Sequence, residues 1–190
     1  MVRSRSGRGV TAGDGDMGIH RTEMLQGPDG HLSVVEYLGL FEHGGEIREA
    51  VLQLKYQEKT KIAESLAMKV VQEMPKDKGC DVVTWAPTTS QRRQARGFDQ
   101  AELIARHLAA EIGVRHARLL RRDNGGRQTG SSREERLSRP SFVARPRLQG
   151  MSVWVIDDVM TTGATLRAAA EALVDAGAHR VRCIALSWVK

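Results

Sequence analysis

Near its C-terminus the chain reads Val153-Trp154-Val155-Ile156-Asp157-Asp158-Val159-Met160-Thr161-Thr162-Gly163-Ala164-Thr165. The apolar run Val153–Ile156 predicts a buried β-strand, and two adjacent carboxylates follow it. A turn comes next, and it leads into a segment with apolar residues at helical spacing, namely Leu166, Ala170, Leu173 and Val174. The sequence therefore predicts a strand, an acidic strand end, a turn and a helix in immediate succession.

The chemistry of this stretch indicates a sugar phosphate. The turn offers hydroxyls and backbone N–H groups at the start of a helix, where unsatisfied donors and the helix dipole favour a phosphate. Asp157 and Asp158 are acceptors suited to sugar hydroxyls, as an acidic residue is for ribose in dinucleotide-binding folds. A ribose 5-phosphate meets both requirements. In the alternative interpretation Thr161 or Thr162 only caps the helix, but adjacent carboxylates repel each other and are an unusual choice for structure alone.

The stretch resembles the phosphoribosyl pyrophosphate (PRPP) motif of the type I phosphoribosyltransferases. The resemblance implies that Asp157 and Asp158 are the catalytic pair and hold the ribose 2- and 3-hydroxyls. It implies a Mg²⁺ ion that bridges sugar and pyrophosphate and is held through PRPP, with no direct protein ligand. The 5-phosphate would be bound by the turn, Thr161, Thr162, Gly163, Ala164 and Thr165.

A second polar segment follows the predicted buried strand 81–86, which Pro87 ends. Hydroxyls and clustered guanidinium groups across from a sugar-phosphate site suit a pyrophosphate leaving group. The alternative is a solvated basic turn before a helix that begins near Gln100, with Asp99 as its N-cap. The candidate pyrophosphate-binding residues are Thr88, Thr89, Arg92, Arg93 and Arg96.

Three further segments resemble the ComF family, also called GntX. Arg96-Gly97-Phe98-Asp99-Gln100-Ala101 is similar to its Arg-Gly-Phe-Asn-Gln-Ala motif, and the stretch 45–56 resembles its opening segment. Residues 127–137 match its Gln-x-Gly-x-Ser-Arg-x-x-Arg stretch. The resemblance implies a type I phosphoribosyltransferase-like fold, a part in DNA uptake in some bacteria, and interaction with single-stranded DNA or its machinery. Many relatives begin with a Cys-rich zinc ribbon, for which Cys80 and Cys183 lie too far apart.

The segment 121–150 is a predicted mobile loop. It is longer than an ordinary connection and contains eight arginines between Arg121 and Arg147. It could close over pyrophosphate and exclude water, or it could be a solvated loop whose arginines keep it soluble. The candidate lid residues are Arg127, Gln128, Arg133 and Arg136.

The chain is predicted to fold as one α/β domain over residues 31–190, after a disordered tail over residues 1–30 that lacks apolar periodicity. Strands alternate with helices, which predicts a mostly parallel sheet flanked by helices on both faces. Besides 153–156, strands are predicted over 32–38, 81–86, 117–120 and 181–189, and helices over 47–54, 62–74, 100–112 and 166–176.

The net charge of +6 favours an anionic partner. With no apolar run long enough to span a membrane, we expect a cytoplasmic protein that forms no membrane contact and could form a homodimer. The first hypothesis is a PRPP- and Mg²⁺-dependent phosphoribosyltransferase that releases pyrophosphate and acts on an unknown acceptor. The second is a non-catalytic competence or DNA-uptake module that interacts with single-stranded DNA or its machinery. The third is a PRPP-sensing regulator.

Overall fold

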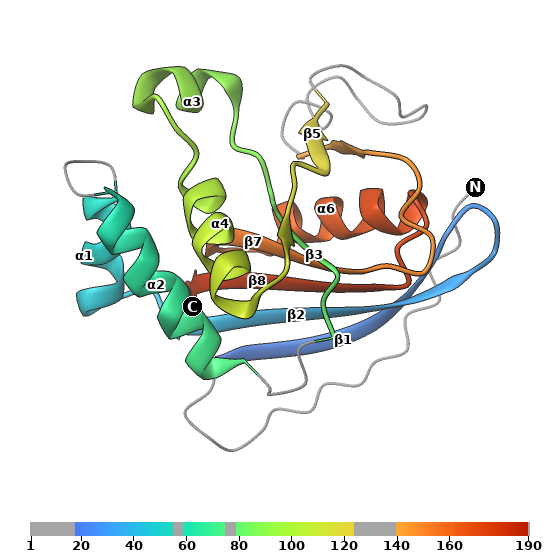
Figure 1. The fold of residues 1–190 in the computed structure, drawn as a ribbon, viewed down its shortest axis with the longest axis horizontal. Helices are drawn as coiled ribbons and strands as arrows, with labels where there is room; N and C mark the ends of the chain where they lie inside the picture. The colour runs from blue at the N-terminus through green and yellow to red at the C-terminus, as the bar shows by residue number, and fades with distance from the viewer. Residues whose placement is uncertain (1–17, 55–58, 75–78, 124–139, 190) are drawn as a thin grey trace.

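The computed structural model describes residues 18–54, 59–74, 79–123 and 140–189. Its centre is a six-stranded sheet of order β1-β2-β8-β7-β3-β4 (Figure 1). Neighbouring strands pair in parallel except β1 and β2, which are antiparallel. The predicted, mostly parallel sheet is therefore confirmed. Its strands are β1 (Ile19–Gln26), β2 (Leu32–Glu42), β3 (Val82–Trp85), β4 (Arg115–His116), β7 (Ser152–Met160) and β8 (Arg180–Trp188).

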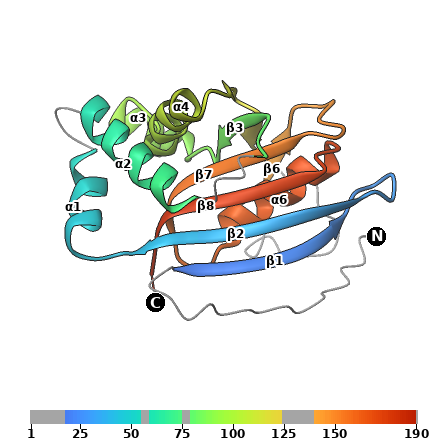
Figure 2. The same ribbon diagram turned by 60° about the horizontal axis from the view of Figure 1, so that its bottom comes forward.

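Helices cover both faces of the sheet, as expected. On one face, α2 (Lys59–Glu73) and α4 (Gln100–Ile112) pack against alternate residues of β7, Trp154 and Ile156, and α1 (Gly45–Gln53) adds Val51. On the other face, α6 (Ala164–Asp175) packs against Val153 and Val155. Figure 2 shows β7, β8, β2 and β1 in a row, with α1, α2 and α4 grouped at one side.

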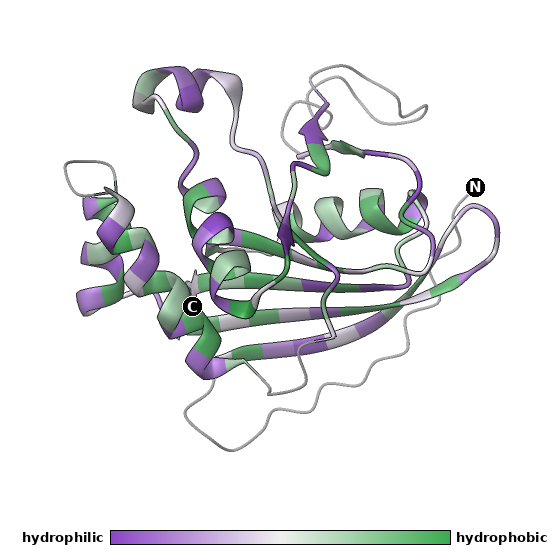
Figure 3. Cartoon of the chain, viewed as in Figure 1, coloured by the Kyte–Doolittle hydropathy of each residue, from purple (hydrophilic) through white to green (hydrophobic). Residues whose placement is uncertain are grey.

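The central strands are apolar on both sides because both sides are covered. All four residues of β3 are buried, and so are seven of the nine residues of β8. Figure 3 shows this as mostly hydrophobic colouring along β7 and β8. Each parallel strand points its carboxyl end toward the same edge of the sheet, and ligands of such sheets bind beyond that edge.

The prediction of a disordered tail over residues 1–30 was wrong for its second half. Ile19–Gln26, within the predicted tail over residues 1–30, forms β1 and pairs residue by residue with β2. One inward residue of β1 is Glu23, which is 7% exposed and accepts a 2.8 Å hydrogen bond from the Tyr37 hydroxyl. Because an inward-facing position is occupied by a carboxylate, the sequence of β1 does not show the alternation of apolar and polar residues that predicts a strand. Residues 1–17 lie outside the described ranges.

The predicted mobile loop over 121–150 is partly regular structure. β5 (Leu120–Arg122) and β6 (Phe142–Ala144) form a two-stranded antiparallel ribbon. The short strand predicted over 117–120 overlaps the structure only at Leu120, where β5 begins, and β4 ends just before that range. β7 runs four residues beyond the predicted 153–156. Residues 124–139, the middle of the predicted loop, lie outside the described part of the chain.

None of the helices that the structure describes combines the length and apolar character needed to cross a bilayer.

Candidate functional site

The acid pair lies inside β7 rather than after it. Asp157 and Asp158 are half-buried, and each carboxylate accepts a hydrogen bond from the next backbone N–H, at 2.9 Å from Asp158 and 2.8 Å from Val159. Successive residues of a strand point to opposite faces. Val155 lies on the face toward α6 and Ile156 on the face toward α4, but this alternation does not continue past the acids, since Val159 packs on the α4 side and Met160 on the α6 side. The side chains of Asp157 and Asp158 are close enough to interact directly.

Electrostatic effects link the acid pair to the groups around it. Burial raises the pKa of Asp157 well above its usual range, and the charge of Asp158 raises it further. Burial also raises the pKa of the Cys183 thiol, and the charge of Asp157 adds to that rise. Burial likewise raises the pKa of Asp99, at the start of α4, where the charge of Asp158 contributes. The acid pair and Asp99 thus concentrate negative charge at this edge of the sheet.

The turn after β7 leaves backbone donors open. Gly163 is the N-cap of α6, with φ of 74°, and no side chain caps the helix. The first helical hydrogen bond runs from Arg167 N–H to the Gly163 carbonyl, at 2.9 Å. The N–H groups of Ala164, Thr165 and Leu166 therefore precede the helical ladder. Helix capping does not explain the threonines. Among the described residues, the one hydrogen bond from a backbone N–H of this turn to a threonine hydroxyl is weak, at 3.4 Å from Ala164 N–H to Thr162 Oγ1.

Accessibility in the turn fits a binding surface. Thr161, Thr162 and Ala164 are exposed, while Gly163 and Thr165 are half-buried. The exposed hydroxyls, and the amides that precede the helical ladder, begin three residues after Asp158 along the chain. All five predicted phosphate-binding residues are thus at the carboxyl edge of the sheet, beside Asp157 and Asp158.

The second predicted segment contains a helix that the sequence did not predict. α3 (Ser90–Arg96) begins after Thr89, whose hydroxyl accepts a 3.3 Å hydrogen bond from the Arg92 N–H. Thr88 and Thr89 are half-buried. Arg92 and Arg93 are exposed, and an Arg93 Nη2 lies 3.9 Å from Glu102 Oε2. Arg96 ends α3, and its side chain lies outside the described part of the structure.

Asp99 has a different role from the predicted one. It occupies the N-cap position of α4, but its side chain makes no capping hydrogen bond. Its Oδ2 instead accepts a 2.8 Å hydrogen bond from the Thr88 N–H, and the residue is only 4% exposed. Asp99 thus connects the start of α4 to the residue that follows β3 and Pro87. This contact fixes the predicted pyrophosphate segment against the sheet.

Arg122 belongs to the same region and was not a predicted site residue. Its Nε donates to the Pro87 carbonyl at 3.3 Å, and its guanidinium lies 5.3 Å from the centre of the Phe142 ring. Burial lowers the pKa of Arg122, the charge of Arg92 lowers it further, and the charges of Asp157 and Asp99 raise it. Nothing in the sequence separates Arg122 from the many arginines around it.

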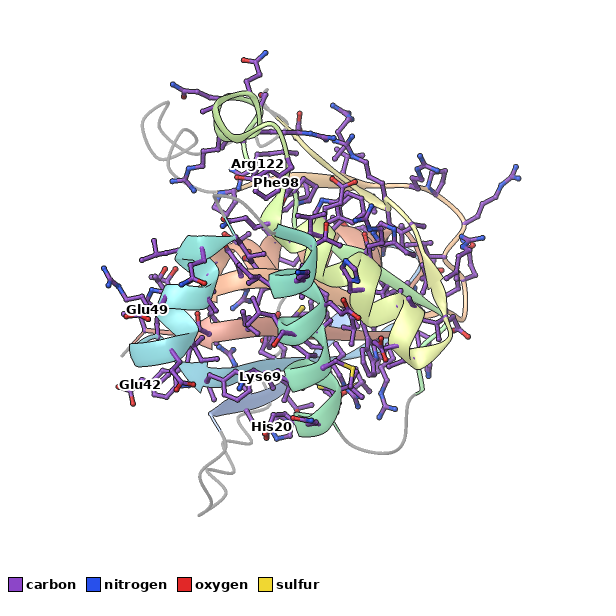
Figure 4. All side chains as sticks on the ribbon, turned by 60° about the vertical axis from the view of Figure 1, so that its left-hand side comes forward. His20, Glu42, Glu49, Lys69, Phe98 and Arg122 are labelled. Carbon is purple, nitrogen blue, oxygen red and sulfur yellow. The ribbon has the colours of Figure 1, made fainter. Side chains whose placement is uncertain are left out.

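The structure therefore brings the two predicted segments together at one end of the molecule. Figure 4 shows Phe98 and Arg122 at this end, near α3, with Lys69 and His20 well away from them. Figure 3 shows strongly hydrophilic residues on α3 and β5 here. The predicted lid residues Arg127, Gln128, Arg133 and Arg136 lie outside the described residues.

Sequence comparison finds a known domain in this part of the chain. Residues 95–187 match the family described as the phosphoribosyl transferase domain. The matched stretch begins at the end of α3 and includes α4, the acid pair, the turn and most of β8.

Two curated relatives share more limited similarity. The chain is 36% identical to competence protein ComFC of Bacillus subtilis over 92 residues, which are 48% of this chain and 37% of the relative. It is 28% identical to DNA utilization protein YhgH of Salmonella typhi over 142 residues, which are 70% of this chain and 63% of the relative. The chain thus spans less than two thirds of the length of these relatives.

A solved structure shares the fold. Glutamine PRPP amidotransferase from B. subtilis, in complex with ADP and GMP, matches with a TM-score of 0.50 and 19% sequence identity, over 87% of this chain and 37% of that one. At this identity the likeness concerns the fold alone. Together, the sheet and these matches show a type I phosphoribosyltransferase-like fold, and part of the chain is similar to the two curated relatives.

Proposed function

We propose that the chain binds PRPP together with Mg²⁺ and transfers the phosphoribosyl group to an acceptor, with release of pyrophosphate. The observation that carries the proposal is the end of β7. There a half-buried acid pair is followed directly by a turn with exposed hydroxyls and a helix start whose first N–H groups are outside the helical ladder. A sugar bearing a phosphate monoester matches this order of groups.

Three parts of PRPP have three sets of candidate partners. The 5-phosphate would accept hydrogen bonds from the turn Thr161–Thr165. The ribose hydroxyls would donate to Asp157 and Asp158. The pyrophosphate would lie toward Thr88 and the exposed Arg92 and Arg93, whose guanidinium groups suit phosphate oxygens.

The residues present fit a Mg²⁺ ion that is held mainly by the ligand. Mg²⁺ requires near-ideal octahedral oxygen coordination and usually keeps substrate phosphates and waters in its shell. The half-buried carboxylates of Asp157 and Asp158 would hold the sugar hydroxyls beside the ion. The ion would neutralise charge on the departing pyrophosphate.

The chain's own residues would act by positioning and by charge. In the transfer, the bond from C1 of the ribose to pyrophosphate breaks with its electron pair leaving on pyrophosphate oxygen. The acceptor then bonds to C1 and loses a proton. The sugar passes through an oxocarbenium-like state, as in glycoside hydrolysis. Asp157 and Asp158 would stabilise this positive ring, while the fixed turn holds the 5-phosphate in place.

Calorimetric titration with PRPP and Mg²⁺ tests binding. We expect the wild-type protein to bind and the Asp157→Asn/Asp158→Asn variant to lose binding. Glu111→Gln is the matched control, because Glu111 is an exposed carboxylate at the C-terminal end of α4, away from the candidate site. Equal affinity of the wild type and the double variant would contradict the role of the acid pair. Pyrophosphate release with a panel of nucleobases and small amines then tests transfer, and no release with any acceptor would count against catalysis.

A second candidate function is binding of single-stranded DNA. It is favoured by exposed arginines on and around β4, β5 and β6, and the described residues offer them no salt-bridge partner; they are Arg115, Arg118, Arg121, Arg145 and Arg147. The segment that contains Arg115, Arg118 and Arg121 lies next to the segment that contains Arg145 and Arg147, because Arg145 N–H donates to the Leu119 carbonyl at 2.8 Å. The names of both curated relatives, competence and DNA utilization, agree with this candidate.

Salt dependence distinguishes this function. If several arginines contact phosphates, binding of a single-stranded oligonucleotide should weaken with salt, with a log–log slope of about −0.7 per contact. Replacing Arg118 and Arg145 by Gln should then lower both the affinity and the slope. Absence of binding even at low salt would end this candidate.

A further inference from the structure

Arg122 connects three parts of the candidate site. It lies on β5, its Nε donates to the carbonyl of Pro87 at the end of β3, and its guanidinium lies over the ring of Phe142 on β6. Phe142 is itself 8% exposed and is the β-ladder partner of Arg122. A half-buried arginine held by both a hydrogen bond and a ring has a fixed direction.

Two acidic residues at the edge of the sheet, Asp157 and Asp99, act on Arg122. The charges of Asp157 and Asp99 favour the charged guanidinium, against the effects of burial and of Arg92. Asp99 is 4% exposed, and Asp157 lies at the end of β7. Arg122 is therefore close enough to Asp157 and Asp99 to feel their charges, and it supplies a positive charge where burial alone disfavours one.

The contacts of Arg122 leave a binding edge. Its guanidinium carries five N–H donors, and the Nε–H is the one used by Pro87. No partner for its two Nη groups occurs within the described ranges. A lysine could not keep the hydrogen bond, the ring contact and a free two-pronged edge at once, because its ammonium is a compact point charge.

We propose that Arg122 is a ligand-binding residue of this site that directs its Nη groups at the diphosphate of PRPP. The inference rests on the proposed function and adds a residue to it. In this arrangement the Pro87 carbonyl and the Phe142 ring set the direction of the guanidinium, and bidentate contact with phosphate oxygens follows from its planar geometry. The same cation reduces the repulsion between the acid pair and the negatively charged diphosphate.

Two probes separate this role from a structural one. PRPP with Mg²⁺ contains the diphosphate, and ribose 5-phosphate lacks it. We expect Arg122→Gln to weaken PRPP binding by about 10- to 100-fold, the usual range for a hydrogen bond to a charged group, with ribose 5-phosphate affinity unchanged. Arg122→Lys should recover part of the loss. Arg106→Gln is the matched control, since Arg106 is an exposed arginine of α4 that belongs to neither candidate binding set.

The outcomes are distinct. If wild-type protein binds neither probe, the proposed function fails before Arg122 is tested. If wild type binds both and Arg122→Gln keeps full PRPP affinity, or loses both probes equally, the inference about Arg122 is overturned. Urea unfolding of each variant shows whether the protein remains folded under the titration conditions. Selective loss of PRPP affinity, absent in Arg106→Gln, supports the inference.

Discussion

At the scale of single residues, Asp99 combines a favourable hydrogen bond with an unfavourable buried charge. It accepts the Thr88 N–H at 2.8 Å but is 4% exposed, and burial raises its pKa. A carboxyl whose pKa is higher in the folded state is least costly at low pH, and its ionisation destabilises the fold as the pH rises above the unfolded value of 3.8. An asparagine could accept the same hydrogen bond without the charge.

We therefore predict that Asp99→Asn increases the free energy of unfolding at neutral pH. The difference from wild type should shrink as the pH falls and vanish below 3.8, where the wild-type carboxyl is protonated in both states. Asp99→Ala, which removes the acceptor as well, should be less stable than both at pH 7. Urea unfolding over this pH range measures all three proteins, and a less stable Asp99→Asn at pH 7 would contradict the account.

Gly163 supplies a backbone conformation that the turn requires. Its φ of 74° is in the left-handed region, which costs other residues about 1–2 kcal/mol. Gly113, the C-cap of α4, has a similar φ of 71° and lies away from the turn. We predict that Gly163→Ala and Gly113→Ala lose similar stability in urea unfolding. Only Gly163→Ala should also weaken PRPP binding in titration calorimetry. An equal effect of both variants on PRPP affinity would show that the turn does not contact the ligand.

At the scale of elements, the sequence predicts those that repeat an apolar pattern. The predicted helix over 100–112 coincides with α4, because Ile104, Leu108 and Ile112 recur on one face and Gly113 ends it. α3 was missed because Ser90–Arg96 is polar on every side and has no face to bury. β4 and β5 have two and three residues, too few for a period to show.

The β1–β2 pair depends on a polar contact that no apolar pattern indicates. Glu23 is buried beside Tyr37, whose hydroxyl donates to it at 2.8 Å, and Arg21 lies 3.0 Å from the same carboxylate. We predict that Tyr37→Phe lowers the free energy of unfolding by about 1–3 kcal/mol, because it leaves a buried acceptor without its donor. Thr22→Ala, at an exposed position of β1, is the control. A loss in urea unfolding no larger than that of the control would show that the hydroxyl contact is not stabilising.

At the scale of the whole molecule, the site could be predicted only in part. Asp157, Asp158 and the turn are contiguous in sequence, so local chemistry was sufficient to find them. Asp99 and Arg122 act through contacts with Thr88 and Pro87. Those contacts exist only because β3 and β7 are neighbours in the sheet and because the β5–β6 ribbon lies over the same edge. Such residues become recognisable only once the strand order is known.

A ligand held by these segments should stabilise the entire fold. The candidate site joins separate parts of the fold, since the acid pair lies on β7, the turn begins α6, and Thr88 follows β3. A ligand that binds only the folded state adds about 2.7 kcal/mol when its concentration is 100 times its dissociation constant. For a domain of this size that corresponds to a rise in Tm of about 5–10 °C.

We predict this rise for wild-type protein with PRPP and Mg²⁺ in a thermal melt, and none for Asp157→Asn/Asp158→Asn at the same concentrations. Mg²⁺ with inorganic diphosphate is the control ligand, because it contains the phosphates without the ribose that the acid pair would hold. It should raise the Tm less than PRPP does. An equal rise in the double variant would mean that PRPP binds without the acid pair, and an equal rise with diphosphate would mean that the ribose adds nothing to binding.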